Sequence, residues 1–135
     1  MTTKLDKRII LSTLWIFLSV NYLFCDILSN MEASALKALM TGEIAGIVLT
    51  EKFLLFAAIS LEIPFLMILL SRICPYKINR RLNVLAPVLM IIYQVGSMFV
   101  GSAPTLHYMF FSTVEVLGNL AIFFIAITWK KEQVL

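Results

Sequence analysis

Residues 53–71 read FLLFAAISLEIPFLMILLS and decide the fold class of this chain. The stretch contains one charged residue, Glu62, and as a helix it would cross about 30 Å of hydrocarbon at roughly 1.5 Å of rise per residue. Because the interior of a bilayer offers the backbone no hydrogen-bond partners, a segment of this kind must be helical there. The sequence therefore predicts a membrane-spanning helix with one acidic side chain near its middle.

Three further apolar segments have the same character, at residues 9–28, 82–100 and 106–129. Each has roughly the 19–24 residues that a membrane span requires. The chain has 135 residues, of which 61% are hydrophobic and 14% are charged, whereas soluble domains carry about 25% charged residues. We therefore predict an all-α fold, with residues 1–135 forming a single integral membrane domain built as a four-helix transmembrane bundle.

The longest connection, residues 29–52, contains the sequence NMEASALKALMTG. Asn30 is a suitable cap for a short helix that Gly42 would end. Three apolar side chains would share one face of this helix: Leu36, Leu39 and Met40. The pattern fits a helix lying in the membrane interface, and it equally fits a loop helix that packs over the bundle.

All but two of the 11 Lys and Arg residues fall on one side of the predicted spans. These are Lys4, Lys7, Arg8, Arg72, Lys77, Arg80, Arg81, Lys130 and Lys131, whereas the other side has Lys37 and Lys52. Because basic loops stay in the cytoplasm, both termini are predicted to be cytoplasmic. Membrane lipids with anionic headgroups are the expected partners of these loops. Four aromatic residues are candidate interfacial anchors: Trp15, Tyr76, Tyr108 and Trp129.

The cysteines and the histidine argue against several classes of protein. Cys25 and Cys74 are expected on opposite faces of the membrane, where they cannot form a disulfide. The chain has no C-x-x-C motif and a single histidine, His107, so thiol-redox chemistry and a His-based haem or metal site are disfavoured and no cofactor is expected. No basic run with interleaved aromatic residues suggests a nucleic-acid partner.

Every predicted helix carries a strongly polar side chain near the middle of the bilayer, counted at roughly 1.5 Å per residue from its basic end. This band contains Glu62, Glu115, Asn21, Gln94 and Asn119, and Asp26 lies nearer the outer face. A carboxylate at the centre of a spanning helix costs about 2.5–3.5 kcal/mol, so both glutamates are expected to face the interior of the bundle. We predict that these six residues bind a substrate, in a cavity lined by polar stripes that also contain Tyr22, Ser97 and Ser112.

Two interpretations of this polar band stay open. In the first, Glu62 and Glu115 exchange protons as a cationic or polar substrate binds. In the second, both are neutral and hydrogen-bond to Asn21, Gln94 and Asn119, which holds helices together at about 0.6 kcal/mol per bond. For Asp26, the alternative is an ordinary hydrated carboxylate in the interface.

Three segments carry a resemblance to a known family: LWIFLSVNYLFCDIL, TEKFLLFAAISLEIPFLMILLSR and GSAPTLHYMFFSTVEV. Together they resemble a family of bacterial and archaeal four-helix membrane proteins that is known only as a domain of unknown function. The resemblance implies four helices in an inner (cytoplasmic) membrane and no known activity. More distantly, the size and helix count are similar to those of DoxX-like membrane proteins, some of which are subunits of oxidoreductase systems. The Arg and Gly pattern of the first helix of that group is absent from residues 9–28, and no functional residue is carried over.

The leading hypothesis is a small binding or transport protein that works as a homo-oligomer. The second is an accessory or anchoring subunit of a membrane complex, including an oxidoreductase-linked one. Such a subunit would offer a partner helix small residues, either Gly96 and Ser97 or Gly118 and Ala121. A membrane enzyme acting on a lipid or quinone is the least supported class, because the sequence contains no evident nucleophile–base pair.

Overall fold

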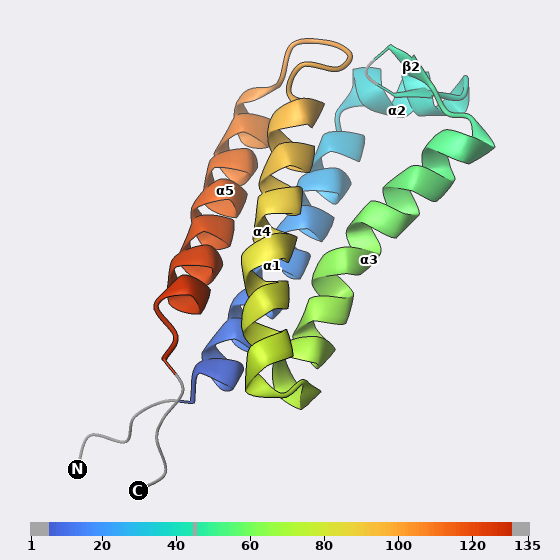
Figure 1. Ribbon diagram of the computed structural model, residues 1–135. Helices are drawn as coiled ribbons and strands as arrows, with labels where there is room; N and C mark the ends of the chain where they lie inside the picture. Colours follow the sequence, from blue (N-terminus) through green and yellow to red (C-terminus); the bar gives the residue numbers. More distant parts are fainter. Residues whose placement is uncertain (1–5, 45, 131–135) are drawn as a thin grey trace, which may run out of the picture.

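The computed structural model describes residues 6–44 and 46–130, and most of them are helical (Figure 1). The elements in chain order are α1 (Lys7–Asn30), α2 (Ala33–Met40), β1 (Glu43–Ile44), β2 (Ile47–Val48), α3 (Glu51–Ile73), α4 (Tyr76–Ser97) and α5 (Leu106–Ile127). The two short strands pair antiparallel between α2 and α3. The predicted all-α class is confirmed, and the small strand pair was not predicted.

The four long helices lie side by side and alternate in direction (Figure 1). Helix α1 packs against α3 and α5, and α4 packs closely against α5 and more sparsely against α3. Figure 1 shows why the last contact is sparse, since the first turns of α3 lean away from α4. Helix α2, the strand pair and the α4–α5 connection lie at one end, which we call the α2 end.

The bounds of α1, α3 and α5 lie within a turn of the predicted spans, whereas α4 starts and ends earlier in the chain than the span predicted at residues 82–100. Helix α4 begins at Tyr76, directly after Pro75, and ends at Ser97. Its first turns were missed because they are polar and basic rather than apolar. The predicted cap of the short helix is also wrong, because Asn30 is the last residue of α1 and Glu32 precedes α2. Gly42 follows the end of α2 with a φ of +82°, which suits glycine.

Among the described residues, three helices are long and apolar enough to cross a membrane: α1, α3 and α5. Helix α4 is the least apolar of the four long helices, since it begins with basic residues and carries Asn79 and Asn83. The presence of helices that could span a bilayer is thus confirmed. A bundle in which all four helices span it stays a prediction.

The basic residues separate between the two ends of the bundle. The end opposite α2 holds the start of α1, the α3–α4 connection and the end of α5, and these segments carry Lys7, Arg8, Arg72, Lys77, Arg80, Arg81 and Lys130. Lys37 and Lys52 belong to the α2 end. Lys4 and Lys131 lie outside the described residues. The side of the membrane on which each end lies is not tested by the structure.

Part of this basic cluster closes the end of α5. Arg80 donates hydrogen bonds from Nε to the Ala126 carbonyl at 3.1 Å and from Nη2 to the Ile127 carbonyl at 2.8 Å. The Tyr76 hydroxyl donates to the Trp129 carbonyl at 2.7 Å. The last carbonyl groups of a helix lack partners within it and carry a partial negative charge, which a cation neutralises. Arg80 therefore has a structural role in addition to its charge.

A buried polar network joins α1, α3 and α4 in the half of the bundle away from α2. Trp15, which the sequence places a little too deep for an interfacial anchor, is fully buried. Its Nε1 donates to Asn83 Oδ1 at 2.7 Å, and Asn83 Nδ2 donates to Asn79 Oδ1 at 2.7 Å and to Ser71 Oγ at 3.1 Å. Asn79 Nδ2 donates to the Ser71 carbonyl at 2.6 Å. Every member therefore has a partner, as a polar group removed from water requires.

Helices α1 and α5 approach closely at Gly118. A Cβ atom on Gly118 would lie 2.6 Å from Leu18 Cδ2, which is closer than packing allows. Leu18 therefore fills the space beside Gly118, where the accessory-subunit hypothesis expected a partner helix to pack. Gly96, in the other predicted groove, has no atom within 4 Å of such a Cβ and is exposed.

Replacing Asn83 tests the buried network. In Asn83→Ala, the Trp15 indole loses its acceptor and Ser71 and Asn79 lose a donor, so we expect the free energy of unfolding to fall by about 1–3 kcal/mol. Thermal unfolding in detergent, followed by tryptophan fluorescence, measures this change. Asn21→Ala is the matched control, because the Asn21 amide bonds only within its own helix, to the Phe17 carbonyl. Equal stability of the two variants would contradict the network's role.

Candidate functional site

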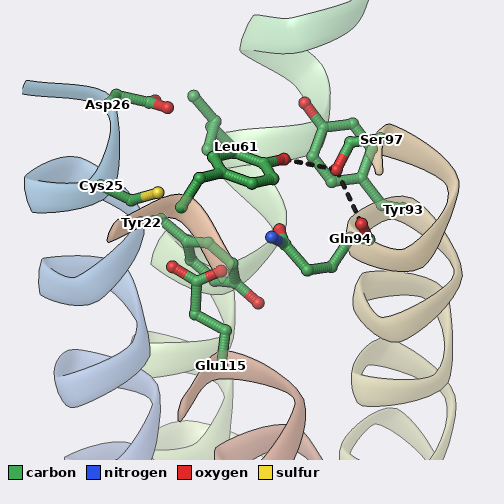
Figure 2. Close-up of a pocket in the computed structure, with 9 residues that line it drawn as sticks. Tyr22, Cys25, Asp26, Leu61, Tyr93, Gln94, Ser97 and Glu115 are labelled. Carbon is green, nitrogen blue, oxygen red and sulfur yellow. Dashed lines mark hydrogen bonds between the residues drawn. The ribbon is translucent and has the colours of Figure 1, made fainter. Parts of the chain in front are cut away.

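A pocket of about 70 Å³ lies within the half of the bundle that is nearer α2 (Figure 2). Helices α1, α4 and α5 supply most of its walls, and α3 contributes Leu61. The charged residues of the lining are Asp26 and Glu115, and the polar ones are Tyr22, Tyr93, Tyr108, Gln94, Ser97 and Cys25. None of the described lining residues is Lys, Arg or His, so the charged groups of the pocket are all acidic.

Glu115 forms the floor of the pocket. It is 0% exposed, and neither carboxyl oxygen has a hydrogen-bond partner among the described residues. Figure 2 shows its side chain rising from α5 toward the space that Asp26 faces from α1. A buried acceptor without a donor costs about 1–3 kcal/mol, which native folds normally avoid. Glu115 also lines the pocket, so its unpartnered carboxyl group adjoins this space.

Asn119 lies one helical turn from Glu115 and adds a third oxygen of this kind. Its Nδ2 donates to the Tyr22 hydroxyl at 2.8 Å and to the Glu115 backbone carbonyl at 2.8 Å. Its Oδ1 is buried and has no partner in the described part of the chain. Because the Tyr22 oxygen accepts from Asn119, the hydroxyl proton of Tyr22 is free for another acceptor. The floor thus combines three unsatisfied acceptor oxygens with one available donor.

The wall from α4 is held in place by hydrogen bonds. Gln94 Nε2 donates to Ser112 Oγ at 2.6 Å, which ties α4 to α5. Ser97 Oγ donates to the Gln94 carbonyl at 2.7 Å and also lies 2.6 Å from the Tyr108 hydroxyl. Since the Ser97 proton is already used, Tyr108 is the donor of that second bond. These bonds fix the polar side of the pocket before any ligand arrives.

Asp26 marks the mouth of the pocket. It lines the pocket and is nevertheless exposed, whereas Glu115 is fully buried. Asp26 belongs to the last turns of α1, which places the mouth toward the α2 end (Figure 1). An acid at the mouth and another at the floor, with no positive charge in the described lining, favour cations over anions.

Of the six predicted site residues, the structure brings four together. Asp26, Gln94 and Glu115 line the pocket, and Asn119 adjoins it through Tyr22. Asn21 does not belong to the pocket, because it is half-buried and its amide donates to the Phe17 carbonyl of its own helix at 2.9 Å.

The expectation that Glu62 faces the interior is wrong, because its side chain is exposed on α3. The buried face of α3 carries Ser60, Pro64, Met67 and Ser71. These four recur at helical spacing, and Glu62 follows Ser60 by two residues, which is roughly 200° around the helix. The side chain of Glu62 therefore points away from the bundle core. The periodicity of the small and polar residues, rather than the depth of the carboxylate, decides its direction.

Tyr22 belongs to the polar stripes that the sequence predicts to line a cavity, whereas Tyr93 and Tyr108 do not. Tyr108 is a predicted interfacial anchor, yet it shares a helix face with Ser112, Glu115 and Asn119 at offsets of four, seven and eleven residues. That spacing was the signal for its inward direction. For Tyr93 and Cys25, the sequence pattern gives a weaker indication of a place in the pocket, because their neighbours there come from other helices.

His107, the single histidine of the sequence, does not line the pocket. Within the described residues, no three His, Cys, Asp or Glu side chains are placed to hold a metal ion. His107 lies elsewhere in the α2 half, with Nε2 at 3.2 Å from Ser29 Oγ and Nδ1 at 3.1 Å from Thr105 Oγ1. Ser29 Oγ already donates to the Cys25 carbonyl, so His107 is the donor to Ser29. The histidine joins α1 to the start of α5.

Residues 2–135 match the model of a family described as "Family of unknown function (DUF6326)", and the chain belongs to this family. No curated protein and no solved structure matches the chain. The predicted membership of an uncharacterised family is thus confirmed. The distant likeness to DoxX-like proteins and the bacterial or archaeal origin stay predictions. The pocket is therefore the feature of the chain that indicates a function.

Glu115→Met tests whether the carboxyl group is unsatisfied in the free protein. The thioether fills a similar volume without needing donors, so we expect the free energy of unfolding to rise by about 1–3 kcal/mol. Gln94→Met is the control and should lower it, because Gln94 loses its bond to Ser112. Thermal unfolding by circular dichroism in detergent measures both. A loss of stability in Glu115→Met as large as that in the control would contradict this account.

Proposed function

We propose that this protein is an integral membrane protein that binds a small organic cation between Asp26 and Glu115. The observation that carries the proposal is the pair of buried, unpartnered Glu115 carboxyl oxygens at the floor of a pocket whose charged lining is wholly acidic. A cation with N–H groups supplies the donors that these oxygens lack, and its charge suits a lining that contains acidic and no basic residues.

The membrane setting rests on the outer surfaces of the helices. Large apolar side chains such as Phe17, Leu55 and Leu117 are exposed on α1, α3 and α5, which suits contact with lipid chains. Helix α4 fits the same setting, because Asn79, Asn83 and Gln94 point inward. Its outer face has three exposed apolar residues at helical spacing: Leu85, Leu89 and Ile92. We therefore place all four long helices across the bilayer.

The orientation follows from the basic residues at the end opposite α2. With that end in the cytoplasm, the α2 end faces outward and Asp26 opens the pocket to the outer side. The location in an inner (cytoplasmic) membrane rests on the same distribution of charge and on the sequence resemblance. A ligand would enter past Asp26 and reach Glu115 from outside the cell.

The size and chemistry of the pocket favour a compact ligand. A volume of about 70 Å³ is about half that of a roughly 150 Å³ cavity able to hold benzene, so the pocket suits a ligand of a few non-hydrogen atoms. The rings of Tyr22, Tyr93 and Tyr108 surround the space, and aromatic rings attract ammonium and guanidinium groups at close range. Methylammonium and guanidinium are therefore suitable probes.

The geometry supports binding better than passage through a single chain. Beneath the pocket, the bundle is closed by side chains that are no more than 1% exposed: Leu11, Trp15, Leu18, Met90 and Ile122. Transport would require this apolar layer and the Trp15–Asn83 bond to open. Binding needs only the part of the bundle that already has the mouth and the floor.

Cys25 provides a direct test, because its thiol lies in the pocket wall. In Cys74→Ser protein in lipid nanodiscs, the cationic reagent 2-aminoethyl methanethiosulfonate should modify Cys25 about tenfold faster than the anionic 2-sulfonatoethyl reagent. Methylammonium should protect the thiol. Mass spectrometry of the intact protein measures the rate.

The matched variants separate the pocket from the rest of the chain. Asp26→Asn and Glu115→Gln should each reduce the preference for the cationic reagent and weaken protection, whereas Glu62→Gln should leave both unchanged. Equal rates for the two reagents without protection by methylammonium or guanidinium would overturn the proposal. A stoichiometric protein partner in that case would favour the accessory-subunit hypothesis instead.

A further inference from the structure

Glu62 lies on the outer face of α3 and does not line the pocket. Glu62 is exposed, and it lies about 16 Å from each end of the helix at roughly 1.5 Å of rise per residue. The side chain is too short to reach either membrane surface from that depth. If α3 spans the bilayer, as proposed above, the carboxyl group faces hydrocarbon, which is costly for an acidic side chain. The cost is relieved when a second protein surface covers this face.

The pattern around Glu62 is that of a helix-pairing face. Five exposed apolar residues share its side of α3: Leu55, Ile59, Leu66, Leu69 and Ile73. Leu55, Glu62 and Leu69 are seven residues apart, and Ile59, Leu66 and Ile73 form a second row with the same spacing. A seven-residue repeat of apolar side chains is the pattern by which two helices pack along their length. A single polar residue in such a seam sets the register of the pair.

The donors of the chain's own bundle cannot serve Glu62. Gln94 and Asn119 are buried on inward faces, where they bond to Ser112 and Tyr22. The basic residues of the described part of the chain lie at or near the ends of the bundle, far from the middle of α3. None of these groups supplies a partner for Glu62, whereas a second molecule packed on this exposed face could.

We propose that this molecule is a second copy of the same chain, with the two α3 helices packed in parallel about a twofold axis along the membrane normal. Two copies inserted in the same orientation have Glu62 at the same depth in the membrane. Twofold dimers are also the commonest homo-oligomers. A carboxyl group that keeps its proton is both donor and acceptor, so two of them satisfy each other across the axis.

Cysteine cross-linking with Glu62 intact tests the face. In a Cys25→Ser, Cys74→Ser background in liposomes, Leu55→Cys and Leu69→Cys should form disulfide-linked dimers on oxidation. Leu117→Cys is the matched control, because Leu117 and Leu55 are both 61% exposed, on α5 and α3 respectively. It should stay uncross-linked. Cross-linking at Leu117 as efficient as at Leu55, or none at either α3 position, would overturn the proposal.

Substitution of Glu62 tests the contact itself. Förster transfer between labelled copies in liposomes should show that Glu62→Leu weakens dimerisation roughly three- to thirty-fold, the range expected for interhelical hydrogen bonds. Glu62→Gln should restore most of it, because an amide also donates and accepts. Unchanged dimerisation in Glu62→Leu, or a chain that stays monomeric at all protein-to-lipid ratios, would overturn the inference. The Cys25 reaction monitors the pocket separately, so failure of the dimer and failure of cation binding are distinguishable.

Discussion

The hydrogen bond from the Trp15 indole to Asn83 joins α1 to α4 across the middle of the bundle, and the rest of the polar architecture follows from the same constraint. Where lipid surrounds a protein, each polar group must find its partner inside the protein. In the half opposite α2, this requirement is met: Asn79, Asn83 and Ser71 are mutually bonded, and Arg80 closes the end of α5. In that half, the polar side chains named here bond to other groups of the chain and need no ligand.

In the α2 half, this requirement for internal hydrogen-bond partners is not met around Glu115. Hydrogen bonds in this half hold Gln94, Ser97 and Tyr108 in position, but the oxygens of Glu115 are left without donors. Among the described residues, the buried side-chain polar atoms without a partner are the two Glu115 carboxyl oxygens and Asn119 Oδ1, and the proposed cation would supply the donors that they lack. Helices α1 and α5 approach closely at Gly118. The same two helices contribute the Tyr22–Asn119 hydrogen bond and the Asp26 and Glu115 side chains of the pocket, so packing and site depend on each other.

The sequence alone predicts those features that depend on local apolar content. Helices α1, α3 and α5 follow from long apolar runs, whereas the first turns of α4 are polar because Asn79 and Asn83 point into the bundle and Arg80 serves α5. Depth along a helix selected four residues that the fold gathers at one pocket, because Asp26, Gln94 and Glu115 line it and Asn119 adjoins it through Tyr22. Depth did not predict the exposed position of Glu62, because the depth of a residue along a helix does not determine which way its side chain points. Direction follows from which residues pack, and that depends on neighbouring helices.

Infrared difference spectroscopy of the Glu115 carboxyl group in lipid nanodiscs tests the central claim most directly. Adding methylammonium should shift the carboxyl bands of the wild-type protein and of Glu62→Gln, and the shift should vanish in Glu115→Gln. That result would place the cation at the floor of the pocket. A spectrum that methylammonium leaves unchanged, or a shift that persists in Glu115→Gln, would contradict the account and leave the Glu115 carboxyl group without a ligand.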